Sequence, residues 1–168
     1  EAFEKLPSEC SHLFMAIDYE LAAVICIEDP LREEAANVIR ELKEAGISKV
    51  VMMTGDSDRT AKAIASRVGV DEYYSEVLPE DKASFVEAEK KAGRKVIMIG
   101  DGINDSPALS AADIGIAISD GAEIAREIAD ITVGADSLNE LVTLKLISNG
   151  LMKRIHKNYR FIVSFNTG

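Results

Sequence analysis

Cysteine and long apolar runs are scarce in this 168-residue sequence, and the 19 Lys and Arg are outnumbered by 29 Asp and Glu. The only cysteines are Cys10 and Cys26, and neither has a second Cys or a His at a spacing that completes a metal site, although His12 lies close to Cys10. Free thiols are typical of a cytosolic location. The formal charge of −10 argues against a nucleic-acid-binding protein. The sequence contains no signal peptide, no apolar run of membrane-spanning length, no repeat and no low-complexity linker.

The composition that remains is that of one globular core. Apolar residues make up 47% of the chain and charged residues 29%, which fits a single domain with an appendage. The charge is unevenly spread, because the segment 138–168 has five Lys and Arg against the single acid Glu140. The chain starts at Glu1 and stops within an apolar stretch that begins at Phe161, so we expect a piece of a larger protein.

Hydrophobic periodicity and turn residues predict an order of helices and strands. Segments 13–17 and 21–27 flank Asp18-Tyr19-Glu20 and predict a hairpin. The predicted strands that follow are 49–53, 73–77, 96–99, 114–118 and 131–133. The predicted helices are 29–46, 57–68, 79–92, a short one ending at 112, 121–129 and 136–161.

Strands and helices alternate from Asp29 to Val133, which predicts an α/β fold: a Rossmann-like parallel sheet with helices on both faces and right-handed crossovers. An N-terminal β-hairpin and a long C-terminal helix complete the expected architecture. In such a sheet, ligands bind at the carboxyl ends of the strands. The polar residues that follow strands are therefore the candidate site residues.

The stretch Lys95-Val-Ile-Met-Ile-Gly-Asp-Gly-Ile-Asn-Asp105 is central to the prediction. Its apolar run predicts a strand that is buried on both faces. Gly100 and Gly102 allow a sharp turn, and Asp101 then lies at the strand end as a hard oxygen ligand for Mg²⁺. Asn104 and Asp105 add polar groups. The alternative is a strand–turn–helix corner whose Asp and Asn only cap a helix.

Two further groups belong to the same predicted edge. Thr54-Gly55-Asp56 follows the strand 49–53, and Lys82 stands near the start of the helix that follows Pro79. A hydroxyl and an ammonium group beside the carboxylate of Asp101 predict a site for a phosphoryl group and Mg²⁺. Alternatively, Thr54 caps a helix and Lys82 is a solvated helix lysine.

The order of these motifs resembles the haloacid dehalogenase superfamily, and within it the phosphorylation domain of P-type cation-transporting ATPases. Met53-Thr54-Gly55-Asp56 resembles the family's Thr-Gly-Asp segment, and Glu28-Asp29-Pro30-Leu31-Arg32 resembles its hinge. Gly100 to Leu109 is similar to the segment that carries the Mg²⁺-binding aspartate, and the match continues in 112–117 and 129–131. Asp29 to Arg32 and the tail 154–166 are most similar to the heavy- and transition-metal branch.

The resemblance implies a pump that transfers the γ-phosphoryl group of ATP to an aspartate and moves a metal cation. It implies that Asp101 binds Mg²⁺, that Thr54 and Lys82 bind the phosphoryl group, and that Asn104 and Asp105 hold the loop and its charge network. Gly55 and Asp56 would contact nucleotide or hold the turn. Arg32 would reach nucleotide phosphates.

One departure from the family pattern concerns the phosphorylated aspartate. No Asp in this chain is followed by Lys-Thr, and Asp81-Lys82 is followed by Ala83. The resemblance therefore divides the chain into the end of a nucleotide-binding domain and hinge (1–28), the C-terminal part of a phosphorylation domain (29–135) and a long helix towards the membrane stalk (136–168). We expect this chain alone to be inactive, and the cation is not predicted because its membrane ligands are not in this sequence.

The C-terminal segment predicts attachment to a membrane independently of the resemblance. Lys153, Arg154, Lys157 and Arg160 stand just before the apolar residues 161–165, as on the cytoplasmic flank of a membrane helix. The chain would then be a cytoplasmic domain of an integral plasma-membrane or cell-membrane protein. The alternative is a solvated basic helix end.

Two other functions remain open. A soluble phosphatase of the same superfamily needs Asp-x-Asp before Asp29, and the nearest sequence is Asp18-Tyr19-Glu20 in the predicted hairpin turn. A partner-binding fragment without chemistry would keep the fold alone. The upstream coding sequence would discriminate, because Asp-Lys-Thr-Gly-Thr and membrane spans would support the pump.

In the superfamily, a central strand that carries the nucleophile stands between the strands equivalent to 49–53 and 95–99. That strand is missing here, so unpaired backbone groups would remain in the interior at about 1–3 kcal/mol each. One hypothesis is that the fully apolar segment Leu21–Ile27 occupies the vacancy. The favoured alternative keeps the hairpin outside the sheet, with its edges shielded by a second copy in a dimer.

Overall fold

The computed structural model describes residues 11–27, 31–101, 104–118, 127–134 and 137–167, and the elements are named in chain order. The strands are β1 (Ser11–Ile17), β2 (Glu20–Ile27), β3 (Val51–Met53), β4 (Glu72–Tyr74), β5 (Ile97–Gly100), β6 (Ile114–Ile118) and β7 (Ile131–Val133). The helices are α1 (Ala35–Glu44), α2 (Asp58–Val68), α3 (Pro79–Lys91), α4 (Ser106–Ala111) and α6 (Asn139–Thr167). The predicted helix 121–129 lies mostly outside the described residues.

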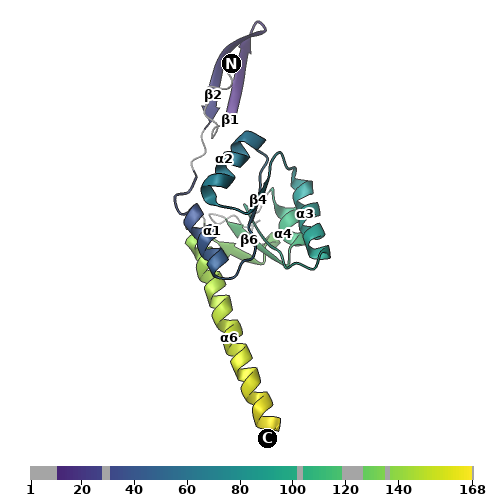
Figure 1. Ribbon diagram of the computed structural model, residues 1–168. Coiled ribbons are helices and arrows are strands. Elements are labelled where there is room, and N and C mark those ends of the chain that lie inside the picture. Colours follow the sequence, from purple (N-terminus) through teal and green to yellow (C-terminus); the bar gives the residue numbers. More distant parts are fainter. Residues whose placement is uncertain (1–10, 28–30, 102–103, 119–126, 135–136, 168) are drawn as a thin grey trace.

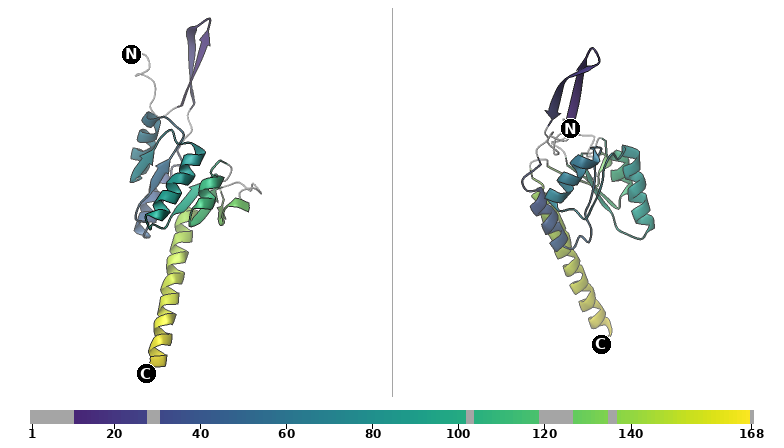
Figure 2. Two further views of the ribbon diagram at one scale, coloured as in Figure 1. Left: turned by 90° about the vertical axis from the view of Figure 1, so that its right-hand side faces the viewer. Right: turned by 45° about the horizontal axis from the view of Figure 1, so that its top comes forward.

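Strands β3–β7 and helices α1–α4 form an α/β unit, the body, which lies between two projections (Figure 1). The β1–β2 hairpin extends from one end, and most of α6 extends from the other end to the C-terminus (Figure 2). Helices lie on both sides of the body's strands. The predicted fold class is confirmed, including the N-terminal hairpin and the long C-terminal helix.

The strands of the body are parallel, as predicted, but they form two separate ladders. Strand β3 pairs with β4, and β5 pairs with β6, which pairs with β7. Within the described residues no backbone ladder joins β3 to β5. The body is therefore split at the position where the resemblance locates the missing strand.

The hypothesis that Leu21–Ile27 fills this position is wrong. Strand β2 pairs antiparallel with β1 along its whole length, from Ser11↔Ile27 to Ile17↔Glu20. Asp18 and Tyr19 form the turn with positive φ values of 52° and 68°. The hairpin is a local structure that closes by its own two-residue turn. Because this turn needs no long-range contact, the hairpin is favoured over insertion of β2 between β3 and β5.

The prediction that the strand around residues 96–99 is buried on both faces is also wrong. Met98 is 7% exposed, whereas Ile97 and Ile99 are 41% and 37% exposed. Successive side chains of a strand point to opposite faces, so one face of β5 packs on the core and the other remains open. The open face lies on the strand that borders the split.

The core consists of two clusters. Val86 of α3, Met98 of β5 and Leu109 of α4 form the first with Ala108, and Met53 of β3 packs against it. The second joins β6 and β7 to the first turns of α6, through Ile116, Val133 and Leu141. Because Met53 belongs to the other ladder, side-chain packing rather than backbone pairing joins β3 to β5.

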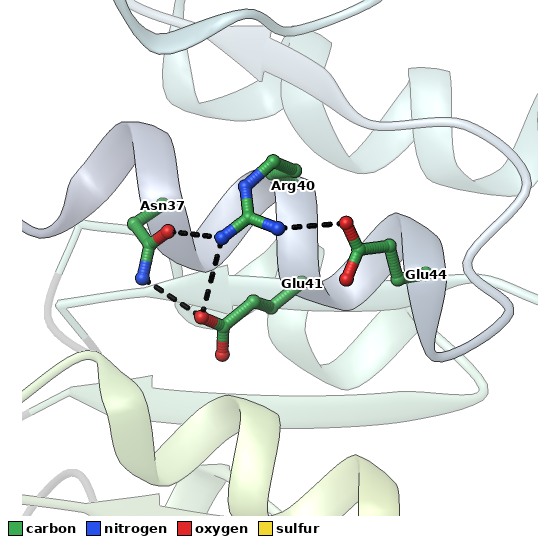
Figure 3. Close-up of polar contacts among 4 residues, drawn as sticks. All are labelled: Asn37, Arg40, Glu41 and Glu44. Atoms are coloured by element: carbon green, nitrogen blue, oxygen red, sulfur yellow. Dashed lines mark hydrogen bonds and ion pairs between the residues drawn. The ribbon is translucent and has the colours of Figure 1, made fainter.

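Helix α1 begins later than predicted, at Ala35 rather than at Asp29-Pro30, which lie outside the described residues. The N–H of Ala35 donates to the carbonyl of Arg32 at 3.0 Å, so a turn precedes the helix. Figure 3 shows the polar face of α1, where Arg40 pairs with Glu44 at 2.7 Å and also contacts Asn37 and Glu41. Such exposed pairs one turn apart each stabilise a helix by only about 0.2–0.5 kcal/mol.

Helix α6 is longer than predicted and continues past Phe161 to Thr167. Its start is anchored, because Leu141 and Val142 are buried and the Asn149 side chain donates to the carbonyl of Ala45 at 2.7 Å. Among the described helices, none combines the length and the apolar character needed to cross a bilayer. Residues 150–166 are exposed throughout.

Candidate functional site

The turn after β3 holds the first predicted residues. The Thr54 hydroxyl donates to the Asp56 carboxylate at 2.7 Å, and the Asp56 N–H donates back to the Thr54 hydroxyl at 3.1 Å. This reciprocal pair fixes the turn around Gly55. The cap of α2 is Ser57, whose hydroxyl accepts from the N–H of Thr60, so the interpretation of Thr54 as a helix cap is wrong.

The loop between β4 and α3 supports this turn, and this support was not predicted from the sequence. The N–H of Val77 donates to the Thr54 carbonyl at 3.0 Å, and the N–H of Glu76 donates to the Asp56 carbonyl at 2.9 Å. Glu76 adopts a positive φ of 54°, which non-glycine residues rarely do. No pattern in the sequence could have predicted these contacts, because the backbone makes both of them.

Lys82 and Asp105 form the best-buried ion pair of the described residues. Their Nζ and Oδ1 atoms are 2.7 Å apart, and the side chains are only 17% and 12% exposed. Lys82 lies in the first turns of α3, directly after the loop that bonds to the Thr54 turn, and Asp105 precedes α4. The interpretation of Lys82 as a solvated lysine is therefore wrong.

Gly100 at the end of β5 makes room for this pair. A methyl group at its Cα would lie 2.7 Å from Cβ and 2.9 Å from Cγ of Asp105, which is too close. The Asp105 backbone carbonyl accepts from the N–H of Leu109 at 2.9 Å and so begins α4, while its carboxylate turns to Lys82. The glycine is needed here for close approach.

Asp101 and Asn104 lie together in the loop after β5. The Asp101 carboxylate accepts from the backbone N–H of Asn104 at 3.3 Å, and both residues are exposed. Gly102 lies outside the described residues. The N-cap of α4 is Asp105, without a side-chain cap bond, so neither Asp101 nor Asn104 caps that helix.

The donor set fits a Mg²⁺ ion that keeps most of its water. Mg²⁺ is usually held by one or two carboxylates together with substrate phosphates, rather than by a cage of protein ligands. The exposed Asp101 carboxylate at a strand end supplies one such ligand. In the described part of the chain, no group of three or more His, Cys, Asp or Glu side chains is arranged to hold an ion by itself.

The remaining candidate, Arg32, is an exposed residue in the turn before α1. The structure thus arranges the predicted residues as three local pairs: Thr54 with Asp56, Lys82 with Asp105, and Asp101 with Asn104. The loop 75–78 and helix α3 connect the first pair to the second, and β5 leads to the third. Together they bridge the split between the ladders.

At the opposite edge of the strands, three aspartates make hydrogen bonds that were not predicted from the sequence. Asp71, Asp113 and Asp130 each precede a strand and accept a backbone N–H from the neighbouring segment, at Val50 (2.7 Å), Val96 (2.9 Å) and Gly115 (2.8 Å). The repeated Ala-Asp-Ile at 112–114 and 129–131 was the available signal. We call these residues the three edge aspartates.

Hydrogen bonds stabilise the charged form of two of these carboxylates. The pKa of Asp71 lies below its ordinary value of 3.8 because Lys43 and then the N–H of Val50 donate to it. The pKa of Asp113 is lowered by the N–H of Val96 and then by Lys95. Both groups stabilise the ladders far from the site.

Comparisons with known proteins agree with this geometry. Residues 2–113 match the family described as haloacid dehalogenase-like hydrolases. Copper-transporting ATPase 2 of Rhizobium meliloti is 42% identical over 156 residues, covering 93% of this chain and 19% of the relative. The manganese-exporting P-type ATPase of Mycobacterium leprae is 41% identical over 155 residues, covering 92% of this chain and 21% of the relative. The chain thus spans about a fifth of the length of these curated relatives.

A solved structure supports the same assignment. The crystal structure of a zinc-transporting PIB-type ATPase in its E2.Pi state superimposes with a TM-score of 0.74 at 35% identity, over 90% of this chain and 24% of that one. The sequence identity is high enough for more than a shared fold. The chain therefore belongs to the haloacid dehalogenase-like hydrolase family, and the relatives named above are heavy-metal P-type ATPases.

Proposed function

We propose that the chain is the phosphoryl-binding part of an ATP-driven heavy-metal cation pump. One observation carries the proposal, the Lys82–Asp105 ion pair, which is 2.7 Å long and largely buried. It joins the start of α3, which follows the loop bonded to the Thr54 turn, to the residue that precedes α4. A buried lysine close to two strand ends suits a phosphoryl group, whose transfer depends mostly on positioning and charge stabilisation. In the proposed parent protein the divisions of the chain are 1–28, 29–135 and 136–168, as expected from the sequence.

Each residue has a role in this proposal. Lys82 has three N–H donors, of which Asp105 uses one, so the others remain to neutralise phosphoryl oxygens. The Thr54 hydroxyl donates to a phosphoryl oxygen once it is released from Asp56. Asp105 holds the Lys82 ammonium group in place, and Asn104 shapes the Asp101 loop. Gly55, Asp56 and Arg32 contact nucleotide when the domains close.

Asp101 is the residue that would hold Mg²⁺. The ion would offset the negative charge of phosphoryl oxygens in the site. The chain's own contribution is to present a carboxylate at a fixed strand end, held by the N–H of Asn104. ATP would reach this site in the parent protein.

The parent protein would lie in a membrane, with this chain on the cytoplasmic side and α6 leading to the bilayer. The transported species is a heavy-metal cation, but the named relatives differ in their metal, copper in one case and manganese in another. The substrate is therefore proposed only as a class. The chain by itself is proposed to be inactive, since no Asp-Lys-Thr sequence occurs in it.

Backbone NMR on this chain tests the site. We expect addition of Mg²⁺ with inorganic phosphate to shift the amide signals of the Thr54 turn, Lys82 and the Asp101 loop. Asp101→Asn should remove the Mg²⁺-dependent part of these shifts. The matched control Asp18→Asn, in the hairpin turn, should leave them unchanged. Shifts centred on other elements, or an unaltered response of Asp101→Asn, would contradict the assignment.

A further inference from the structure

A small pocket lies beside the loop that supports the Thr54 turn. It is lined by the end of β4, the loop after it and the first turns of α3, together with Met53 of β3, and its volume is about 230 Å³. Pockets for drug-sized ligands are larger, at roughly 300–1,000 Å³. The pocket therefore has room for one side chain or a very small molecule, and not for a nucleotide.

Two aromatic rings line this pocket. The ring centroids of Tyr74 and Phe85 are 5.0 Å apart, and the ring planes are inclined by 57°. Tyr74 is 41% exposed and Phe85 is half-buried, so both rings keep accessible surface. The face of an aromatic ring carries partial negative charge and attracts a cation within about 6 Å of its centroid.

Two carboxylates line the same pocket. Glu76 and Asp81 are both exposed, and within the described part of the chain neither carboxylate has an ion-pair partner. The neighbouring cation in the sequence, Lys82, is already paired with Asp105 at 2.7 Å. The negative charge at the pocket is therefore not compensated by a described residue.

Carboxylates beside aromatic faces favour an organic cation, and a guanidinium group fits this combination best. It is planar, it stacks on aromatic rings, and it is more weakly hydrated than an ammonium group. Its fork of N–H donors also matches carboxylate oxygens. A Mg²⁺ ion fits poorly, because it requires oxygen ligands and the rings and the Met53 thioether supply none.

We propose that this pocket binds an arginine side chain from a segment of the parent protein outside these 168 residues, and so holds that segment beside the Thr54 turn. The chain spans about a fifth of the length of its curated relatives, so most of such a parent protein lies outside it. The loop that lines the pocket also bonds to the turn, through the N–H groups of Glu76 and Val77. The proposal rests on the proposed function only for the existence of that parent protein.

An NMR titration of this chain tests the ligand class. We expect N-acetylarginine amide to shift the signals of residues 74–77 and of the Phe85 ring, and the neutral analogue N-acetylcitrulline amide to leave them unchanged. Phe85→Leu should weaken arginine binding by about fivefold, whereas Phe85→Tyr, which keeps the ring, should retain it. Equal responses to citrulline or to N-acetyllysine amide, or unchanged binding in Phe85→Leu, would overturn the guanidinium site.

Charge variants test the two carboxylates. Asp81→Asn should weaken arginine binding by about threefold, and Asp81→Asn with Glu76→Gln by roughly tenfold, as expected for two exposed ion pairs. Glu80→Gln with Glu87→Gln is the matched control, because it removes the same charge from α3 outside the pocket lining. This control should change binding less than twofold. Equal losses in the two pairs would mean attraction to the whole acidic chain and would overturn the proposal.

A photo-cross-link in the full-length parent protein tests the source of the arginine. Leu78 is 57% exposed and does not line the pocket, so photoreactive benzoylphenylalanine in its place leaves the pocket intact. We expect a cross-link within the same polypeptide, to a peptide that contains an arginine and lies outside these 168 residues. A cross-link to a second copy or to another protein, or no cross-link, would overturn the proposal.

These tests and the phosphate titration fail independently. Asp101→Asn should leave arginine binding unchanged, because Asp101 does not line the pocket. Arginine binding without a phosphate response would remove the proposed phosphoryl site and leave the pocket. A phosphate response without arginine binding would do the reverse.

Discussion

At the scale of single residues, the buried pair Lys82–Asp105 links the stability of the body to its proposed chemistry. Each partner is costly to bury alone, because an uncompensated charge is left in a poorly solvated place. The pair also joins the first turns of α3 to the residue that precedes α4. Changes at either partner should therefore affect folding as well as phosphoryl binding.

Replacement of the lysine should be strongly destabilising. We expect Lys82→Met to lower the free energy of unfolding by roughly 3 kcal/mol, because Asp105 is left almost buried and unpaired. Lys91→Met is the matched control: its partner Glu87 lies 3.7 Å away and both side chains are well exposed. That change should cost less than about 0.5 kcal/mol. Urea denaturation measures both, and equal losses would refute the special position of Lys82.

A methyl group at Gly100 should also destabilise the protein, because it would push against the Asp105 side chain of the same ion pair. Gly100→Ala forces Cβ against the Asp105 side chain, at 2.7 Å from its Cβ, and should destabilise the body by about 1–3 kcal/mol. Gly134→Ala, where no atom lies within 4 Å of the added Cβ, is the control and should be nearly neutral. Thermal unfolding of both variants provides the measurement. A neutral Gly100→Ala would mean that Asp105 is not held against the strand end.

At the scale of elements, the three edge aspartates clamp neighbouring segments at the end of the ladders opposite to the site. Asp113 also pairs with Lys95 at 3.0 Å. Each ladder is only two or three strands wide, so few backbone bonds hold it. These side chains add bonds that do not depend on strand length.

The hydrogen bonds of Asp113 predict that the stability of the fold depends on pH. Since the pKa of Asp113 is lowered in the folded state, its contribution to stability is complete above the ordinary value of 3.8 and is lost as the pH falls through the lower, folded value. We expect Asp113→Asn to be less stable than the wild type at neutral pH and the difference to shrink in acid below pH 3.8. Glu87→Gln, on the exposed face of α3, is the control. A stability difference that is constant with pH would rule out the carboxylate as the cause.

Local patterns predicted the elements well where local chemistry decides them. The hairpin, the helix predicted at 57–68 and the strand predicted at 114–118 all occur as expected. The burial of β5 was predicted wrongly, whereas β2 lies outside the sheet as the favoured alternative had it, and only the hypothesis of its insertion is wrong. Both features depend on which strand lies beside them. That information is long-range, and an apolar run alone does not contain it.

The site was predicted in part for the same reason. Motif order indicated that Thr54, Lys82 and Asp101 would lie at one edge of the strands, and the structure connects them through α3. The pairing of Lys82 with Asp105 and the support of the Thr54 turn by Glu76 and Val77 depend on tertiary geometry. Backbone donors have no side-chain signature that a sequence could display.

At the scale of the whole molecule, the split between β3 and β5 explains why the chain is expected to be inactive. The site residues border the position of the strand that carries the phosphorylated aspartate in the family. A segment that supplies this aspartate would complete both the ladder and the chemistry. In the proposed function, the described residues are the phosphoryl-binding side of a reaction whose nucleophile another segment supplies.

Phosphorylation from labelled ATP tests the central claim most directly. In the full-length parent protein, we expect an acid-stable phosphoenzyme that depends on Mg²⁺, its loss in Asp101→Asn, and its retention in Asp18→Asn. The isolated chain should incorporate no label from ATP or acetyl phosphate. Near-normal phosphorylation of Asp101→Asn, or an acid-stable adduct on the isolated chain, would contradict the account.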